Sequence, residues 1–422
     1  MLPEEPTRLL ETTREAYRQY VNPGLERLMS FAGFGLEWQA EGCHVTDAEG
    51  NRYLDCLGGY GVFSLGHRHP KVVEAVKKQL DRMPLSSKVF FNKPLADLAE
   101  RLAAVAPGDL QYSFLCNSGT EAVEAAIKIA RKATHKSKFV CTIGGFHGKS
   151  MGSLSASGRE VFRAPFDPLV PGFVHVPFGD IDSMRQAVDA ETAGVIIEPI
   201  QGEGGIVIPP DGYLSQVASL CKERQALLIV DEVQTGLGRT GRMFAVESEG
   251  VEPDLMTLAK SLGGGVMPSG ATMGTPAVWE PAFAENPLIH SSTFGGNPLA
   301  AVAGLATLQV IEEEGLCERS AQMGLRLLQG LRKVQSEFPT YIAEVRGRGL
   351  MIGIVFSQDD VGELCVGQLT ARGVICAYTL NNPRVIRMEP PLIITEEQCD
   401  FAVSAFGEAM SATAALLADL GE

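Results

Sequence analysis

The sequence predicts an α/β fold, and three observations lead to this prediction. At 422 residues the chain exceeds what one small core organises, so a large domain and a smaller one are expected. Between about residues 61 and 305, short apolar runs alternate with helical stretches, which is typical of a mostly parallel β-sheet. The composition, with 45% apolar and 21% charged residues, is that of an ordinary globular protein.

Five apolar runs are the expected strands of this sheet: Tyr112–Cys116, Phe139–Ile143, Gly194–Ile200, Leu227–Val230 and Leu255–Leu258. Three stretches between them have helical patterns: Glu121–Ala133, Ile181–Val188 and Tyr213–Arg224. Ligands of such sheets bind at the carboxyl ends of the strands, so polar residues at those ends are the first candidates for a site.

The flanking regions complete a three-part organisation. Residues 1–35 are expected to form an amphipathic helix and then a loose stretch broken by Pro23, Gly24, Gly33 and Gly35. A hairpin is expected around Cys43–Asp55, with its turn at Asp47–Asn51.

Residues 299–337 are rich in helix formers and lead into a last α+β portion. We therefore expect an N-terminal segment, residues 1–60, that packs with the small domain. A large ligand-binding domain would cover residues 61–305, and the small domain would cover residues 306–422.

Charge and composition argue against several classes of protein. A formal net charge of −15 disfavours nucleic acid or an anionic membrane as the main partner. The nine cysteines are scattered without a CxxC pair, which indicates reduced thiols. His67 and His69 have no third ligand spaced to join them, so no metal site is expected. Neither a signal peptide nor an apolar run of about 20 residues is recognised, and the expected compartment is the cytoplasm.

Lys260 is the first candidate catalytic residue. It follows the apolar run Leu255–Leu258, and three glycines, Gly263–Gly265, come after two further residues. Burial in such a place lowers the pKa of a lysine and leaves a nucleophilic amine suited to Schiff-base chemistry. The glycines would let a planar ligand approach the backbone. The alternative is a surface lysine before a flexible turn.

Asp231 stands at the end of another buried run, Leu227–Val230, and lies 29 residues before Lys260. That spacing equals about one strand–crossover–strand unit, so the two side chains can face one pocket. An anion beside a ring nitrogen keeps that nitrogen protonated and turns the ring into an electron sink. The alternative is a plain turn or N-cap aspartate.

A third feature is the small polar turn Asn117–Thr120 between a strand and a strong helix. Free amides at the helix start, with Gly119 allowing close approach, form an anion site suited to a phosphate. Ser118 or Thr120 would also serve as an ordinary N-cap.

The segment Gly236–Gly241 matches the letters GxGxxG, but its surroundings argue against a dinucleotide site. Five residues separate it from the end of the strand, no convincing helix follows, and no acid lies about twenty residues on. A nicotinamide oxidoreductase would depend on this segment alone.

Six motifs together resemble the class III aminotransferases, pyridoxal-phosphate enzymes of fold type I. The motifs are NSGTEA, GGFHGKS, EPIQGEGG, DEVQTGLGRTG, LAKSLGGG and STFGGNP, and they occur in the family's order. The resemblance runs from about residue 36 to the C-terminus. Within the class, segments such as DCLGGYGVFSLGHRHP and GGGVMPSGAT are most similar to bacterial putrescine aminotransferases, with ornithine and acetylornithine aminotransferases as near neighbours.

The resemblance implies a role for each matching residue. Lys260 would carry the cofactor as a Schiff base and then shuttle the proton, and Asp231 would hold the pyridine nitrogen. The other residues implied in cofactor binding are Ser118, Gly119 and Thr120 at the phosphate, Phe146 and Val233 on the ring faces, Gln234 at the ring hydroxyl, Glu198, and Thr293 from the neighbouring subunit. That last role implies a homodimer or a dimer of dimers.

The substrate side is implied in the same way. Arg387 matches the carboxylate-binding arginine, whose planar fork meets a carboxylate with two hydrogen bonds. Glu203 matches the acid that pairs with this arginine when no α-carboxylate is present. At Tyr60 the putrescine branch tends to carry phenylalanine, whereas ornithine aminotransferases carry tyrosine.

These implications lead to a functional hypothesis with open alternatives. The chain is expected to transfer an amino group from a diamine such as putrescine or cadaverine to 2-oxoglutarate, giving an aminoaldehyde and glutamate. Ornithine, acetylornithine or 4-aminobutyrate is the alternative donor. An aminomutase of the same fold, or a regulatory protein that only holds the cofactor, is the more remote alternative.

Overall fold

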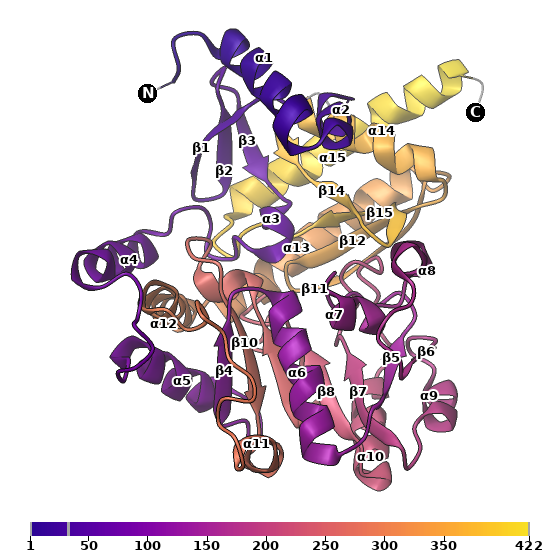
Figure 1. Ribbon diagram of the computed structural model, residues 1–422. Coiled ribbons are helices and arrows are strands. Elements are labelled where there is room, and N and C mark those ends of the chain that lie inside the picture. Colours follow the sequence, from indigo (N-terminus) through magenta and orange to yellow (C-terminus); the bar gives the residue numbers. More distant parts are fainter. Residues whose placement is uncertain (1, 32–33, 421–422) are drawn as a thin grey trace.

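The chain folds around a seven-stranded sheet in the order β4-β10-β9-β8-β7-β5-β6 (Figure 1). This computed structural model describes residues 2–31 and 34–420. The strands are β4 (Tyr112–Cys116), β5 (Lys138–Thr142), β6 (Phe173–Val176), β7 (Thr192–Ile197), β8 (Leu227–Asp231), β9 (Leu255–Leu258) and β10 (Gly270–Gly274). In this sheet β10 is antiparallel to both of its neighbours, and the pairs from β9 to β6 are parallel. The predicted α/β fold with a mostly parallel sheet is confirmed.

The sequence reading missed β6 and β10. Strand β10 begins and ends with glycine, which has a low preference for strands, so its apolar pattern is weak. Its place in the sheet comes from pairing with β4 and β9 on either side.

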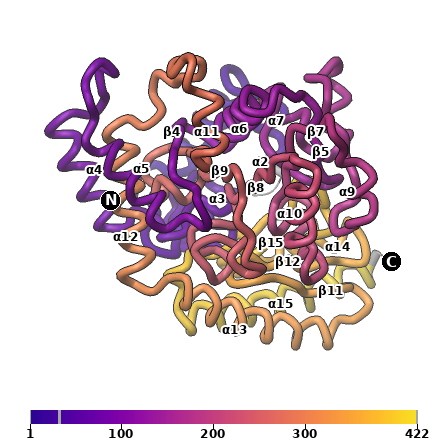
Figure 2. The backbone as a smooth tube through the Cα atoms, turned by 90° about the horizontal axis from the view of Figure 1, so that it is seen from below, coloured from indigo at the N-terminus to yellow at the C-terminus, as the bar shows by residue number. Residues whose placement is uncertain are grey.

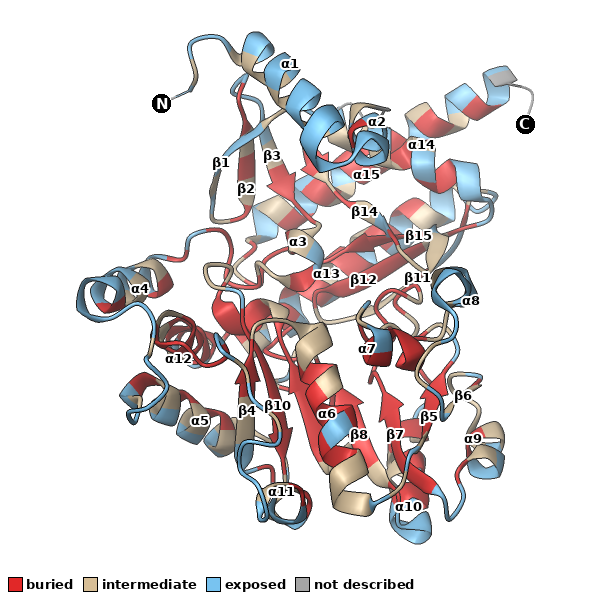
Figure 3. Ribbon diagram, in the orientation of Figure 1, coloured by how far each residue is buried: buried red, intermediate tan, exposed pale blue. Residues whose placement is uncertain are grey.

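Helices cover both faces of the sheet, whose inner strands β7, β8, β9 and β10 are almost entirely buried (Figure 3). Because side chains alternate along a strand, Ile229 of β8 packs into one core while Leu228 and Val230 pack into the other. One face carries α6 (Gly119–Thr134) and α11 (Pro276–Phe283). The other carries α5 (Lys93–Val105), α9 (Ile181–Ala187), α10 (Tyr213–Arg224) and α12 (Pro298–Glu313). Three more helices complete this part: α4 (Pro70–Arg82), α7 (Met151–Ala156) and α8 (Glu160–Arg163).

The C-terminal part forms a separate antiparallel sheet in the order β11-β12-β15-β14. Its strands are β11 (Ile342–Arg348), β12 (Met351–Phe356), β14 (Ala377–Thr379) and β15 (Asn382–Met388). Its helices are α13 (Leu316–Glu337), α14 (Asp359–Thr370) and α15 (Glu396–Leu420), and α13 and α15 run side by side (Figure 2). Residue 305, the expected end of the large domain, lies inside α12, which packs on α4 and α5.

The N-terminal segment joins this C-terminal part through a third sheet, β1-β2-β3-β13. It contains β1 (Glu37–Glu41), β2 (His44–Asp47), β3 (Arg52–Asp55) and β13 (Val374–Ile375). The expected hairpin is the antiparallel pair β2–β3, and β3 pairs in parallel with β13.

The expectation of a loose stretch after the first helix is wrong from Pro23 onward. Helix α1 (Pro6–Ala16) continues into a π-helical turn (Tyr17–Val21), and then α2 begins at Pro23 and runs to Phe31. Proline suits the first turn of a helix, and the Asn22 Oδ1 atom accepts hydrogen bonds from the amides of Gly24 at 2.9 Å and Leu25 at 3.2 Å. Gly33 lies outside the described residues.

The expectation about apolar length also needs correction, because α15 is long and apolar enough to span a membrane by length and composition alone. One side of α15 is buried against α13 and α14, with Ala402, Phe406 and Ala409 among its buried residues. These buried residues are four and three positions apart and so lie on one face of the helix, as in a core helix of a globular domain.

Candidate active site

A cavity of about 640 Å³ lies where the parallel strands end. It is lined by nine of the ten residues implied in cofactor binding: Ser118, Gly119, Thr120, Phe146, Glu198, Asp231, Val233, Gln234 and Lys260. They follow or end β4, β5, β7, β8 and β9, so five strand ends contribute to one pocket, as expected for this type of sheet.

Lys260 enters this cavity directly after β9, as the first residue of a short 3₁₀ helix. Its backbone has φ +47°, a left-handed conformation that costs a non-glycine residue about 1 kcal/mol or more and is typical of functional sites. Burial lowers the pKa of its ammonium group, while the nearby charges of Glu389 and Glu203 oppose this effect. The predicted partly desolvated lysine is therefore present.

Asp231 lies on the strand next to Lys260 and is held by three groups. Its Oδ1 atom accepts hydrogen bonds from Thr257 Oγ1 at 3.0 Å and from the Val233 amide at 3.1 Å. Its Oδ2 atom lies 2.7 Å from His147 Nδ1. Burial opposes a charge on His147, but the hydrogen bond and the charge of Asp231 raise the pKa of His147 above its usual value. The pair thus favours the charged state of His147.

The start of α6 has the geometry of an anion site. Ser118 caps the helix, because its Oγ atom accepts a hydrogen bond from the Glu121 amide at 3.3 Å. The amides of Gly119 and Thr120 lie in the first turn, where no acceptor exists within the helix. A Cβ atom at Gly119 would come within 3.0 Å of Val233 Cγ1, so only glycine fits there without displacing its neighbour.

Glu198 supports the loop that carries Phe146. Its carboxylate accepts hydrogen bonds from the Phe146 amide at 2.9 Å and from the Gly202 amide at 3.1 Å. Burial raises the pKa of Glu198 to about 7. In the structure this acid therefore positions the aromatic residue that faces the cavity.

Gln234 is bonded to an acid that the sequence reading missed. Its Nε2 atom lies 2.9 Å from both carboxylate oxygens of Glu389, which is fully buried. Glu389 follows β15 in the segment Arg387–Leu392. Its position two residues after Arg387 is the one sequence signal that could have identified it.

The three residues implied in substrate binding form a second group beside this cavity. Arg387 and Glu203 make a buried, bidentate ion pair, with Arg387 Nη1 at 2.8 Å from Glu203 Oε1. Burial opposes the charge of Glu203, but the hydrogen bonds from Arg387 hold its pKa below the usual range. The guanidinium group of Arg387 also stacks on the Tyr60 ring, 5.0 Å from the ring centroid.

Tyr60 sits in a left-handed turn, which Figure 1 labels α3 (Gly58–Gly61). All four residues of this turn have positive φ angles. Glycine adopts that conformation without steric cost, so the sequence Gly-Gly-Tyr-Gly accounts for the turn and leaves Tyr60 as its strained member.

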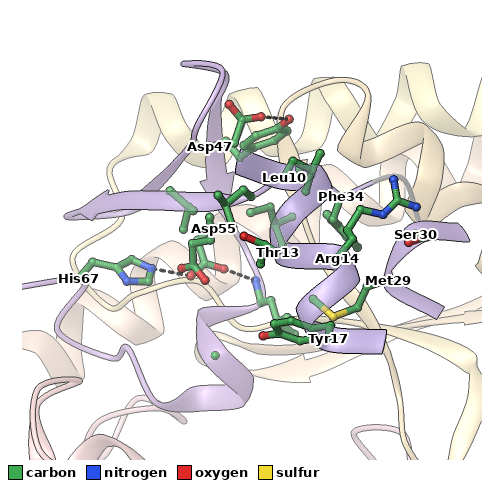
Figure 4. A pocket seen from close by; sticks show the side chains of 18 of the residues that line it. Leu10, Thr13, Arg14, Tyr17, Met29, Ser30, Phe34, Asp47, Asp55 and His67 are labelled. Carbon is green, nitrogen blue, oxygen red and sulfur yellow. Dashed lines mark hydrogen bonds and ion pairs between the residues drawn. The ribbon is translucent and has the colours of Figure 1, made fainter. Parts of the chain in front are cut away.

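A second cavity, of about 670 Å³, lies beyond Tyr60 and Phe63, between the N-terminal helices and the sheet β1-β2-β3-β13 (Figure 4). Its carboxylate groups are those of Glu26, Glu37, Asp47 and Asp55, and Arg14 is its arginine. Figure 4 shows the Asp55 carboxylate facing His67, whose Nε2 atom lies 2.8 Å from Oδ2. The Oδ1 atom of Asp55 accepts a hydrogen bond from the Leu57 amide at 3.0 Å. Phe63 lines both cavities.

Thr293 is exposed and is absent from the lining of its own chain's cavity. Its loop lies near the phosphate-type site, since Asn117 Nδ2 is 3.4 Å from Ser292 Oγ. A role in the site of a neighbouring subunit stays a prediction.

The GxGxxG letters at residues 236–241 belong to a series of turns that leads to a short 3₁₀ helix (Ala245–Glu249). Within it the fully buried Arg239 donates hydrogen bonds to the carbonyl groups of Leu350 and Pro390 and to Ser64 Oγ. This segment therefore joins the large and small parts of the fold.

The close histidines are engaged in pairs. His67 bonds to Asp55 at 2.8 Å, and His69 lies 3.5 Å from Glu314. In the described part of the chain, no group of three or more His, Cys, Asp or Glu side chains is placed to hold a metal ion.

A half-buried lysine, an acid at the tip of the neighbouring strand and a helix start open to a phosphate define a pyridoxal-phosphate enzyme of fold type I. More narrowly, the chain belongs to the class III aminotransferases, because the profile of that family matches residues 36–410. Such enzymes use pyridoxal phosphate and act on small amines and keto acids.

Solved structures agree with this assignment. Ornithine aminotransferase from Toxoplasma gondii is 32% identical, with a TM-score of 0.86, and the match covers 96% of this chain and 97% of that one. A transaminase from the marine bacterium Virgibacillus is 29% identical, with a TM-score of 0.90 and coverage of 97% and 100%. An (S)-enantioselective ω-transaminase from Thermomicrobium roseum is 31% identical, with a TM-score of 0.88 and coverage of 96% and 98%.

Proposed function

We propose that this aminotransferase takes the amino group of a diamine such as putrescine or cadaverine and passes it to 2-oxoglutarate. The observation that carries the proposal is the closed pair of Arg387 and Glu203. While this pair is closed, no free guanidinium is available for an α-carboxylate. The site then suits a donor whose reacting carbon bears no carboxylate, which is an ω-amine.

The charge around the second cavity supports a diamine over an amino-acid donor. Four carboxylates, Arg14 and His67 line this cavity beyond Tyr60. Glu26 is paired with Arg14 and Arg18, and Asp55 with His67, so the carboxylates of Glu37 and Asp47 supply the excess negative charge. Such a charge attracts a second ammonium group and repels the carboxylate of ornithine.

Ornithine is the alternative donor, and Tyr60 is the observation in its favour. The Tyr60 ring is 48% exposed and lies beside the cation Arg387. Its hydroxyl group would hold the α-amino or carboxylate end of an ornithine-like donor.

Each cavity residue has a role that its position supports. Bound pyridoxal phosphate supplies an electron sink for the bond that breaks at the amine-bearing carbon. The Nζ atom of Lys260 would accept the proton from that carbon and return it. Asp231 would hold the ring nitrogen, and the amides of Gly119 and Thr120 would hold the phosphate. Phe146 and Val233 would enclose the ring, and Gln234 would bond its hydroxyl oxygen.

Arg387 would serve the second half of the reaction. The acceptor 2-oxoglutarate brings an α-carboxylate, which competes with Glu203 for the two guanidinium nitrogens. When Glu203 turns away, its Oε2 atom also gives up the hydrogen bond from the Leu380 amide at 2.8 Å. The pair is thus a switch that opens for one substrate and closes for the other.

We also propose that the working enzyme is a homodimer or a dimer of dimers in which Thr293 completes the partner's site. Two adjacent loops support this proposal, because Lys88 and Asn92 donate hydrogen bonds to the carbonyl groups of Gly295 and Gly296. Their apolar side chains are exposed: Val89 by 82%, Phe90 by 80%, Phe91 by 109% and Phe294 by 57%. Such a patch is typical of a protein–protein interface.

A donor panel tests the proposed function. Putrescine, cadaverine, ornithine, acetylornithine, lysine and 4-aminobutyrate are each incubated with the holoenzyme and 2-oxoglutarate, and glutamate is measured. We expect the diamines to give the highest kcat/KM. A clear preference for ornithine would replace the diamine proposal. Tyr60→Phe should then lower ornithine turnover while leaving putrescine turnover nearly unchanged.

A further inference from the structure

Glu389 is a buried acid without a salt-bridge partner. In the described part of the chain its carboxylate forms no ion pair, and its side-chain hydrogen bonds come from the neutral amide of Gln234. A buried carboxylate is costly unless opposite charge or strong hydrogen bonds compensate it. Its retention in the site therefore points to a use for the negative charge.

The backbone holds Glu389 firmly in place. Its amide donates a hydrogen bond to the carbonyl group of Cys56 at 2.7 Å. A Cβ atom at Gly58 would lie 2.3 Å from the Glu389 carbonyl oxygen, so the glycine turn packs directly on this residue. These contacts hold the Glu389 backbone, and therefore the base of its side chain, between the glycine turn and the end of β15.

Glu389, Gln234 and Lys260 converge on one point. A Cβ atom at Gly61 would lie 3.6 Å from Gln234 Cγ, 3.8 Å from Glu389 Oε2 and 3.9 Å from Lys260 Cδ. Gly61 has φ +87° and leaves that space free. The acid is thus a neighbour of both the lysine and the glutamine of the cofactor site.

Three carboxylates act on Lys260, and two of them are already compensated. Glu203 is paired with Arg387, and Asp231 with His147. Glu389 is the third, and its charge raises the pKa of Lys260 against the effect of burial. Arg387 acts on Lys260 in the opposite direction, and Glu198, His147 and Lys149 line the same cavity. The charge of Glu389 also favours the charged forms of the buried Arg239 and Arg387.

We propose that Glu389 is a positioning residue of the cofactor site: it fixes the amide of Gln234 and places a negative charge beside Lys260 that favours the protonated form of the Lys260 nitrogen. This inference rests on the proposed function, in which Lys260 holds pyridoxal phosphate. The first task, fixing Gln234, depends on the position of the carboxylate oxygens as acceptors. The second task, acting on Lys260, depends on the negative charge.

Two variants of the holoenzyme separate these tasks. Glu389→Gln keeps an acceptor for Gln234 but removes the charge. Glu389→Asp keeps the charge but shortens the side chain, so that it no longer reaches Gln234. Absorbance of the bound cofactor is titrated against pH, and pyridoxal-phosphate affinity is measured by adding the cofactor back to stripped enzyme.

We expect Glu389→Gln to lower the pKa of the colour change by about one unit, because a nearby opposite charge favours the protonated form. Glu389→Asp should keep a pKa close to the wild-type value but bind the cofactor more weakly. The aspartate variant also serves as the test if the glutamine variant fails to fold.

An unchanged pKa in Glu389→Gln, or the same fall in both variants, would overturn the inference while leaving the proposed function intact. A wild-type protein that gains no colour with pyridoxal phosphate would refute the proposed function, and this inference with it.

Discussion

Replacing Arg387 with alanine tests the proposed switch most directly. Arg387 is only 1% exposed and makes both hydrogen bonds of the pair with Glu203. Its removal leaves the buried Glu203 carboxylate with the Leu380 amide as its remaining side-chain partner. Breaking a buried pair in this way costs about 3–5 kcal/mol of folding stability.

The effect on the two half-reactions should differ. In the acceptor half-reaction, Arg387→Ala removes the bidentate contact with the α-carboxylate of 2-oxoglutarate. Truncation of a buried, hydrogen-bonded charge pair costs about 2–5 kcal/mol, which corresponds to a rate loss of about 30-fold to 5000-fold. In the amine half-reaction Arg387 is occupied by Glu203, so we expect a loss below about tenfold.

Single-turnover kinetics measure the two steps separately. The cofactor-loaded enzyme is mixed with putrescine, and the amine-loaded enzyme is mixed with 2-oxoglutarate. Glu203→Gln is the matched control, because it leaves Arg387 unpaired; it should slow the amine step and spare the acceptor step. The double variant should recover part of the lost stability. If Arg387→Ala slowed both steps equally, the switch would be wrong and Arg387 would be an architectural residue.

Four further predictions concern single residues. Borohydride should trap pyridoxal phosphate on one peptide containing Lys260, and trapping elsewhere would end the catalytic assignment. Asp231→Asn should reduce kcat about 100-fold or more, the usual effect of removing a preorganised electrostatic contact, and near-normal turnover would make Asp231 a plain turn residue. If Thr293→Ala alone impairs activity, mixing Thr293→Ala subunits with Lys260→Ala subunits should restore some activity in confirmed heterodimers, because one site then keeps both residues. No recovery would place Thr293 in its own subunit's site. Burial raises the pKa of Glu232 to about 7 from 4.5, so the folded state binds the extra proton and the free energy of unfolding falls as pH rises through this range. The glutamine of Glu232→Gln does not ionise, so this variant avoids the cost of a buried charge. In denaturant titrations its free energy of unfolding should exceed that of the wild type by more at pH 8 than at pH 5, and the difference should be at most about 3 kcal/mol.

Much of the cofactor cavity could be predicted from the sequence because its residues follow strands. The positions of Asp231 and Lys260 after two apolar runs implied adjacent strand ends, and β8 and β9 do pair in parallel. The cap at Ser118 and the glycine beside it are equally local, since a helix start is defined by a few consecutive residues. The class of enzyme follows from these local patterns taken together.

Contacts between segments that are distant in the sequence are not indicated by any local sequence pattern. Strand β10 was missed because its place depends on pairing with β4 and β9 on either side. The start of α2 was missed because Pro23 breaks a helix in its interior but suits its first turn.

The sequence by itself therefore determined the fold class, the strand-end site and the lysine, all of which depend on neighbours along the chain. Only the tertiary structure revealed that His147 faces Asp231 and that Glu389 holds Gln234. These pairs join residues separated by 84 and 155 positions. Such charges interact over a few ångströms. A local sequence pattern does not indicate which distant segments come that close after folding.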